Sequence, residues 1–573
     1  MPRHGGSAAP SSRSLRLATA LAGSAALLLT SLPVAAAAPA LHPRNNQVDD
    51  VEVRLLSFGD LGDSLRPPEG DAGSLIQSDG SRVDAGGAGY LAAFLDQLRR
   101  QAPRSLLYSG GGNVAYDGNG PYRMFSGEPT IEVLNSWDIA ASAVGAPELS
   151  EGLGELLRKA QGGCHPEHGC QFGDEFTGAN FPLLGANLVD EAGEPITLPF
   201  SINYVDDVPV GAIGVLMRDA AATASEAGAT GDAVQIEDEL EAIEKTAEVL
   251  EFFGVKAITL LLYGDAAARS ADGPNGCGIE DGPAYTLATE ASPHVDVIFS
   301  AGGPDAFNCT VRDPGGVERP FIRAASNGRT VSVADIVINR HTGEVLRERT
   351  SAFNQVVTRN VEPDHTTQDI IARAEELSIE VGDRQIGEIS GAALSRTTPA
   401  GESPAGRILA DAAQFAATSS DSQAALLPPS ASPRDLDSAV TYRDAFSAPR
   451  PAMLVTLSLT GAELKEALEQ QFRDGDDIML QPSQELTYTI NPGAGPGARV
   501  TDIRIGDSPV VDDETYRITV TDRIAIGGFG FTALGSGTDR AAITTTSKAF
   551  TDYVSTHSPV KVPGEDRVSL QES

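Results

Sequence analysis

Short apolar runs alternate with amphipathic stretches between residues 51 and 299. Ile236–Phe253 repeats apolar side chains at three- and four-residue intervals, which predicts a helix that Gly254 ends. Four other runs have the length and continuous hydrophobicity of buried strands: Val51–Leu56, Ser105–Tyr108, Val255–Leu262 and Val295–Phe299. Because strands separated by helices form sheets that are covered on both faces, we expect an α/β sandwich.

A second unit is predicted to begin near Ile386. Asp364–Leu377 has the pattern of a solitary polar helix and is expected to link this unit to the first. Ser403-Pro404 predicts a helix start, with Ser as the N-cap and Pro at the first helical position. Thr460-Gly461-Ala462-Glu463 has the pattern of a capping box, which predicts a second helix start.

The strands predicted for the second unit are Leu454–Leu459 and Tyr516–Val520, which are apolar or alternate in polarity. Residues 422–438 are rich in Pro, Ser and Ala, and we expect them to form a loop.

The chain is acidic, because 79 Asp and Glu outnumber 42 Lys and Arg and give a formal net charge of −37. Such a chain has no cationic field that could release the counterions of nucleic acid phosphates, and anionic membranes repel it. We therefore expect neither nucleic acid nor an anionic membrane as a partner. At 573 residues the chain is long enough for two or more domains.

The first 38 residues have the pattern of a secretory signal peptide. Arg3, Arg13 and Arg16 flank the apolar run Leu17–Leu32, and the small residues Ala35–Ala38 follow as a cleavage region. The alternative is a retained anchor helix, although the run falls short of the ~20 apolar residues that usually span a bilayer. We expect cleavage near Ala38 and a secreted mature chain without a membrane span.

Export makes disulfides the expected state of the four cysteines. We expect Cys164 to pair with Cys170, and Cys277 to pair with Cys309. The alternative for the first pair is a metal knuckle that also uses His165 and His168. Four ligands so close in sequence crowd a tetrahedral site, and their spacing is not a usual one for zinc.

Four segments, together with their order and spacing, resemble the secreted bacterial 5′-nucleotidase family: Gly86–Gly89, Phe181–Asn187, Glu402–Gly406 and Leu459–Lys465. The resemblance extends from about Val51 to about Thr551. It implies an N-terminal four-layer α/β metallophosphoesterase-like sandwich, a helical linker and a second, α+β domain of the 5′-nucleotidase C-terminal type. The expected boundaries are 1–38 for the signal peptide, 51–355 and 384–560 for the domains, and 362–380 for the linker.

The resemblance also implies a pair of divalent metal ions, one to activate water and both to hold the phosphate. Of the ligands in the family's motifs this chain keeps only Asp60. The family's catalytic His falls on Pro147, and the Asp that orients it falls on Ser150. The other degenerate metal positions are Gly62, Gly111, Ala146, Tyr263, Gly302 and Pro304.

Neighbouring acids could in principle form a replacement site of carboxylates, which suits Mg²⁺ or Ca²⁺. The residues concerned are Asp63, Asp265 and Asp305, and the alternative is that they are solvated loop acids. Asn113 and Glu148 are expected to be local hydrogen-bonding residues rather than ligands.

In the family's C-terminal domain two aromatic rings hold the nucleobase, and a glycine-rich loop with an arginine holds the sugar and base. By resemblance, Arg434 stands at the position of that arginine, while Arg450 and Arg523 fall where the two rings would be. Phe529 replaces an acidic residue of a glycine turn, and Phe531 keeps its final aromatic. Guanidinium groups can stack on bases. The alternative is that the arginines are ordinary surface charges.

We therefore expect a secreted member of this family that is catalytically inactive, needs no cofactor and binds a small anionic ligand or an extracellular protein. The alternative is an active nucleotide phosphohydrolase, which would use a divalent metal pair in a rebuilt carboxylate site. A third possibility is an extracellular binder of solutes or polysaccharides in which Arg450 and Arg523 meet an anion.

Overall fold

The computed structural model describes residues 50–114, 121–165, 169–220, 234–264, 266, 273–279, 281–431, 434–450, 452–473, 477–564 and 566–571. The expected signal peptide, His168 and Asp265 lie outside the described residues. All described residues belong to one compact body, Asp49–Ser573. Its sheets form two sets, one in each of the two units expected from the sequence.

The first set is built from residues 50–356 and contains, among the described residues, two six-stranded sheets. In spatial order, the first sheet consists of β16 (Ser351–Val356), β15 (Thr330–Asn339), β1 (Asp50–Phe58), β4 (Ser105–Ser109), β5 (Ala141–Ala143) and β6 (Leu183–Leu184). The second consists of β13 (Phe307–Arg312), β14 (Glu318–Arg323), β12 (Val297–Ala301), β11 (Ala257–Tyr263), β9 (Val208–Leu216) and β8 (Phe200–Val205). Two small antiparallel sheets pair β2 (Ser74–Ile76) with β3 (Arg82–Asp84) and β7 (Leu188–Val189) with β10 (Gln235–Ile236).

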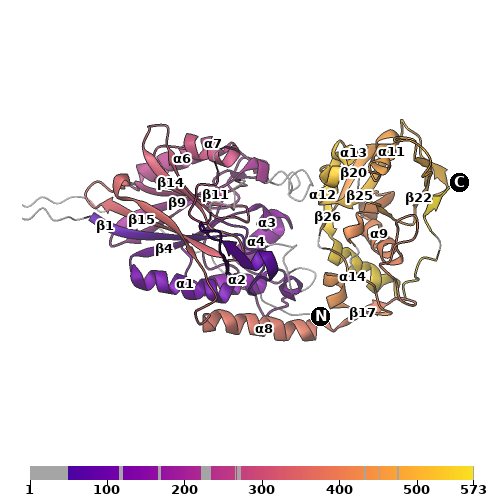
Figure 1. Ribbon diagram of the computed structural model, residues 1–573, viewed down its shortest axis with the longest axis horizontal. Helices are drawn as coiled ribbons and strands as arrows, with labels where there is room; N and C mark the ends of the chain where they lie inside the picture. Colours follow the sequence, from indigo (N-terminus) through magenta and orange to yellow (C-terminus); the bar gives the residue numbers. More distant parts are fainter. Residues whose placement is uncertain are drawn as a thin grey trace, which may run out of the picture. The chain divides into compact units, whose positions relative to one another are not determined.

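Helices cover the outer face of each sheet. The layer on the first sheet contains α1 (Ala88–Gln101), α2 (Glu128–Asn135) and α8 (His365–Gly382), with the short α3 (Ala146–Leu149) and α4 (Leu153–Gln161) nearby. The layer on the second contains α6 (Glu239–Phe252) and α7 (Pro283–Glu290). A third hydrophobic cluster lies between the two sheets. Figure 1 shows the resulting four layers, with α6 and α7 above the sheets and α1 below them.

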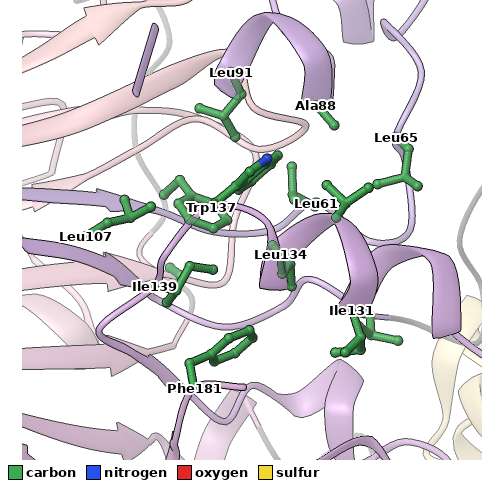
Figure 2. Packing of buried hydrophobic residues seen from close by; sticks show 14 of the residues in the cluster. Leu61, Leu65, Ala88, Leu91, Leu107, Ile131, Leu134, Trp137, Ile139 and Phe181 are labelled. Carbon is green, nitrogen blue, oxygen red and sulfur yellow. The ribbon is translucent and has the colours of Figure 1, made fainter. Parts of the chain in front are cut away.

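Trp137 lies in the hydrophobic core between the first sheet and its helices (Figure 2). Its ring meets Phe58 edge-on at a centroid distance of 5.3 Å, and its Nε1–H donates to Thr367 Oγ1 of α8 at 3.0 Å. The indole therefore buries its apolar surface while its one donor is satisfied, as buried Trp usually requires. This contact fixes the start of α8 against the first sheet.

The second set of sheets is built from residues 385–570. Its five-stranded sheet has the order β21 (Gln481–Pro482), β18 (Ala424–Leu427), β25 (Thr515–Thr521), β20 (Met453–Thr460) and β26 (Thr538–Thr545). Its four-stranded sheet has the order β24 (Ser508–Pro509), β23 (Val500–Ile505), β22 (Leu486–Ile490) and β27 (Val568–Leu570), and β17 (Gln385–Glu388) pairs with β19 (Ala439–Thr441). The helices are α9 (Pro404–Ala416), α10 (Tyr442–Ser447), α11 (Gly461–Glu469), α12 (Asp522–Ala525), α13 (Thr532–Gly535) and α14 (Thr546–His557).

The predicted fold class is confirmed, and so are the two predicted helix starts of the second unit. Ser403 Oγ accepts the N–H of Gly406 at 3.0 Å, with Pro404 as the first residue of α9. Thr460 and Glu463 accept each other's backbone N–H groups at the start of α11. The domain boundaries stay predictions.

Two local predictions differ from the structure. Residues 422–438 do not form a continuous loop, because Ala424–Leu427 is the buried strand β18. Its four apolar residues are too short a run to stand out from the surrounding Pro and Ser. The helix predicted to begin at Ile236 begins at Glu239, where Asp238 caps it by accepting the N–H groups of Leu240 and Glu241.

Both expected disulfides are formed. Cys164–Cys170 and Cys277–Cys309 are bonded, so their sulfurs are not available as thiolate ligands. The metal knuckle considered for Cys164 and Cys170 is therefore wrong. In the part of the chain that the structure describes, no helix is both long enough and apolar enough to cross a bilayer.

Candidate functional site

The sheet edges at the carboxyl ends of the parallel strands bring five loops together, the usual place for a site in such folds. The residues concerned are Asp60 after β1, Gly110–Gly112 after β4, Gly145–Glu148 after β5, Tyr263 at the end of β11, and Gly302–Gly303 after β12. These loops carry most of the positions that the resemblance assigned to metal ligands. The structure thus places those positions together, although few of them carry a ligand side chain.

Asp60 is fixed by backbone contacts to three other loops. Its N–H donates to Gly111 O at 2.9 Å, and its carbonyl accepts the N–H of Asn327 at 2.9 Å. Its carboxylate oxygen Oδ2 accepts the N–H groups of Gly302 at 2.8 Å and Gly303 at 3.3 Å. Its φ of 54° lies in the left-handed region, which Asp tolerates better than most residues. The carboxylate therefore serves to join the β1 loop to the β12 loop.

Glu148 is the most heavily bonded acid of the site. Its Oε2 accepts the N–H groups of Gly112 and Gly145, both at 3.0 Å. Its Oε1 accepts those of Asn113 at 2.7 Å and Val114 at 3.3 Å. The side chain is 5% exposed. A carboxylate that accepts four backbone donors has its lone pairs in use. The expectation that Glu148 is a local hydrogen-bonding residue agrees with these contacts.

The ring of Tyr263 packs against bare backbone between these loops. A Cβ placed on Gly112 would lie 2.9 Å from Tyr263 Cε2 and 2.4 Å from Asp60 Oδ1. A Cβ placed on Gly145 would lie 2.7 Å from the same ring atom. Tyr263 is 7% exposed and belongs to the core cluster of the first sheet. The absence of side chains at Gly112 and Gly145 therefore makes room for an aromatic ring.

Arg323, at the end of β14, supplies a buried positive charge that the sequence analysis missed. Its side chain is 1% exposed, lies over the ring of Phe307 at 5.0 Å and donates from Nε to Asp305 O at 2.7 Å. A Cβ on Gly303 would lie 2.6 Å from its Nη1. Its charge lowers the pKa of Asp60, against the larger effect of burial. The one available sequence signal was a cation that directly follows the apolar pair Phe321-Ile322.

Burial raises the pKa of Asp60 from its ordinary value of 3.8 to about 6. The folded chain then binds a proton more tightly than the unfolded chain, so folding is most favourable below about pH 4 as far as this group is concerned. This contribution is lost as the pH rises from about 4 to about 6. The burial of Asp296 raises its pKa to about 6 as well, and that group contributes with the same sign.

Asp60→Asn is therefore expected to increase the free energy of unfolding at pH 7.5 by about 2 kcal/mol, because a neutral amide avoids the cost of burying a charge. It should also reduce the fall in stability between about pH 4 and pH 6, while Asp296 retains part of that fall. Urea unfolding at a series of pH values measures both effects. If the stability of the variant followed the same pH profile as that of the unchanged chain, the raised pKa of Asp60 would be contradicted.

The remaining predicted positions have structural contacts of their own. Ala146 and Pro147 lie in the first turn of α3, and Ser150 Oγ donates to Pro147 O at 2.5 Å. The N–H of Gly62 donates to Gly112 O at 3.0 Å. Pro304 O accepts the N–H of Ser326 at 3.2 Å. These residues lie near the site but bring no metal-binding group to it.

Of the acids considered as replacement ligands, the structure describes Asp63 and Asp305. Asp63 is 1% exposed and accepts a hydrogen bond from Thr130 Oγ1, so the interpretation of it as a solvated loop acid is wrong. Asp305 contributes its backbone carbonyl to Arg323. Within the described residues, no group of three or more His, Cys, Asp or Glu side chains is arranged to hold a metal ion.

The donor set does not fit a two-metal centre. Such a centre needs several oxygen and imidazole ligands that are open toward the ions. Here both oxygens of Glu148 and one oxygen of Asp60 already accept backbone N–H groups. The described part of the site contains no imidazole, and the positive charge that acts on Asp60 is the guanidinium of Arg323.

The predicted ligand-binding residues of the second unit are only partly brought together. The guanidinium of Arg523 stacks over Phe529 at 4.5 Å, and Phe529 is 40% exposed with a left-handed φ of 53°. Phe531 is fully buried and lies under Arg473, which sequence reasoning missed. Arg434 and Arg450 are exposed. The guanidinium of Arg523 and the ring of Phe529 thus stack on each other.

Comparison with known proteins gives matches over both sets of sheets. The sequence profile described as 5′-nucleotidase, C-terminal domain, matches residues 385–536. The chain is 27% identical over 538 residues to Endonuclease YhcR of Bacillus subtilis, and the match covers 92% of this chain but 41% of that relative. It is 25% identical over 552 residues to the Cell wall protein Lmo0130 of Listeria monocytogenes, covering 88% of this chain and 67% of that relative.

The fold is also similar to that of a solved structure, the NAD nucleotidase NadN of Haemophilus influenzae. The TM-score is 0.61 at 17% sequence identity, and the match covers 91% of this chain and 100% of that one. At this identity the likeness establishes the fold alone.

Proposed function

The chain belongs to the 5′-nucleotidase family, and from that premise we propose that it is a secreted member that has lost phosphoester hydrolysis and acts as a binding or interaction module. The observation that carries the proposal is Glu148, whose carboxylate accepts four backbone N–H groups among the loops where the family's motifs lie. An acid held in this way has no lone pair to offer a cation.

Three further features support the loss of hydrolysis. Tyr263 packs on Gly112 and Gly145, and the nearby positive charge belongs to Arg323. The positions that would carry the catalytic His and its partner are Pro147 and Ser150, which have neither a titratable imidazole nor a carboxylate. Without an activated water and a proton donor, attack on a phosphoester has no machinery in this site.

An extracellular location is the proposal that best accounts for the disulfides and the relatives. Two bonded cysteine pairs favour an oxidising compartment. One relative is named as a cell wall protein. The sequence of residues 1–38 has the pattern of a signal peptide. As ligands we propose a small anion or an extracellular protein, and the net charge of −37 argues against nucleic acid.

The purified protein is expected to show no metal-stimulated hydrolysis. The assay uses AMP, bis-p-nitrophenyl phosphate and DNA with Mn²⁺, Co²⁺, Zn²⁺ or Ca²⁺. DNA is included because one relative is named as an endonuclease. Turnover above a blank that is abolished by Asp60→Ala, but not by Asp96→Ala on the exposed face of α1, would establish the alternative of a rebuilt carboxylate site. Elemental analysis after dialysis provides an independent measure of metal content.

A further inference from the structure

Two adjacent aromatic side chains project into solvent at the end of α6. Phe252 is 85% exposed and Phe253 is 63% exposed. Their rings meet each other edge-on, with centroids 5.5 Å apart. Aromatic side chains each bury about 150–250 Å² when they are covered, so exposing two together forfeits a large hydrophobic contribution. Exposed apolar groups that gather in this way are typical of interaction sites.

Two further residues extend this pair into a patch. Val249, one turn earlier in α6, is 38% exposed. Tyr204, near the end of β8, is 71% exposed. Ile202, two residues earlier, packs against the hydrophobic cluster between the second sheet and α6. Ile202 pairs with Gly211, which Leu250 of α6 covers. Because side chains alternate along a strand, Tyr204 lies on the same face of the sheet as Ile202, the face that α6 covers. We call Tyr204, Val249, Phe252 and Phe253 the aromatic patch.

The surface next to the aromatic patch is acidic. Glu241, Glu244 and Glu248 follow one another along the exposed side of α6 at helical spacing, with Lys245 between them. Asp207 is exposed in the turn that follows β8. Of the nearby ions, Asp206 is paired with Arg104 and Lys256 with Glu344, and the exposed Arg340 donates to Asp206 O at 2.7 Å. The acidic surface next to the patch is therefore mainly that of α6.

Exposed aromatic rings beside acidic side chains favour one kind of binding partner. A second copy of the chain would bring its own charge of −37 to the interface and meet like-charge repulsion. A segment with apolar side chains flanked by Lys and Arg would instead cover the rings and meet the acids of α6, since interfaces combine aromatic anchors with complementary charge.

We propose that the aromatic patch is the docking site for a basic amphipathic helix of another protein. The inference rests on the proposed interaction role but not on the hydrolysis site. After α6 the chain enters β11, and Tyr263 lies at the far end of that strand, about 20 Å away for a strand of this length. Binding at the patch and chemistry at Asp60 can therefore be tested separately.

The test uses a fluorescein-labelled 18-residue peptide of Leu and Lys arranged as an amphipathic helix, with binding to the full protein followed by anisotropy. The double variant Phe252→Ser, Phe253→Ser is expected to weaken binding at least tenfold. Val317→Ser serves as the matched control, because Val317 is an exposed apolar residue between β13 and β14, and it should leave the affinity unchanged. Replacing Lys by Glu in the peptide should abolish binding.

A second measurement separates the patch from general acidity. Glu244→Lys, Glu248→Lys should weaken binding of the Lys peptide without altering the rings. The proposal is overturned if the Lys peptide fails to bind, or if it binds the Phe252, Phe253 variant as tightly as the unchanged chain. It is also overturned if sedimentation shows a dimer that this variant abolishes, or if the variant abolishes binding to phosphatidylcholine vesicles. Hydrolysis in the metal assay would refute the proposed inactivity and leave this result standing.

Discussion

Glu148→Ala is expected to lower the free energy of unfolding by about 3–5 kcal/mol. The change removes the acceptor of four backbone N–H groups, from Gly112, Asn113, Val114 and Gly145. A buried donor that loses its partner costs about 1–3 kcal/mol, and water that enters the vacated space recovers part of the total. Urea unfolding followed by circular dichroism measures the effect.

Two further variants test whether the lost hydrogen bonds cause the loss of stability. Glu148→Gln keeps the shape but turns an NH₂ group toward donors, so it should recover little of the loss. Glu244→Ala removes an exposed glutamate of α6 and is expected to change stability by less than about 0.5 kcal/mol. If Glu148→Ala left stability unchanged or raised it, the carboxylate would behave as a group held ready for a cation, and the structural role would be refuted.

Arg319→Ala is expected to have an effect of similar size, about 3–5 kcal/mol. Arg319 is 1% exposed and lies in β14, beneath the C-terminal end of α7. Its guanidinium donates to four backbone carbonyls, those of Ala288, Ala291, Ser292 and Val295, at 2.7–3.0 Å. Removing it leaves the helix end without donors and opens a cavity.

Arg319→Lys tests whether the planar fork matters. A lysine has three donors on a single nitrogen and cannot reach four separated carbonyls, so most of the loss should remain. Arg312→Ala, on the neighbouring strand, removes an exposed arginine that pairs with Glu318 and is expected to cost less than about 1 kcal/mol. Equal losses of stability for Arg319→Ala and Arg312→Ala would show that the four buried hydrogen bonds of Arg319 contribute nothing specific. Burial, with the nearby charge of Arg347, lowers the pKa of Arg319 to about 10, which still leaves it charged near neutral pH.

The fold could be predicted because its long strands and helices have local patterns. β1, β4, β11 and β12 are apolar runs. Ser403 and Thr460 mark the starts of α9 and α11, because their side chains accept backbone N–H groups there. β18 was missed because a strand of four residues gains its identity from its neighbours, here β21 and β25. Local sequence contains no information about those partners.

The candidate site was predicted as a set of positions but not as a set of contacts. The resemblance located the loops around Asp60, Gly111, Tyr263 and Gly302, and the structure places them together. It did not identify the partners of Glu148, because backbone donors from a loop 34–36 residues away have no side-chain signature. Arg323 was missed for a related reason, since its position beside Asp60 depends on the packing of β14 against β12.

The ring of amides around Glu148 also bears on how this lineage can change. Peptide N–H groups present the positive ends of their dipoles, so a cation restored among these loops would meet an unfavourable field until the backbone turned away. A single histidine placed here would therefore not suffice for a metal centre, and several substitutions would be needed together with a change in the course of the main chain.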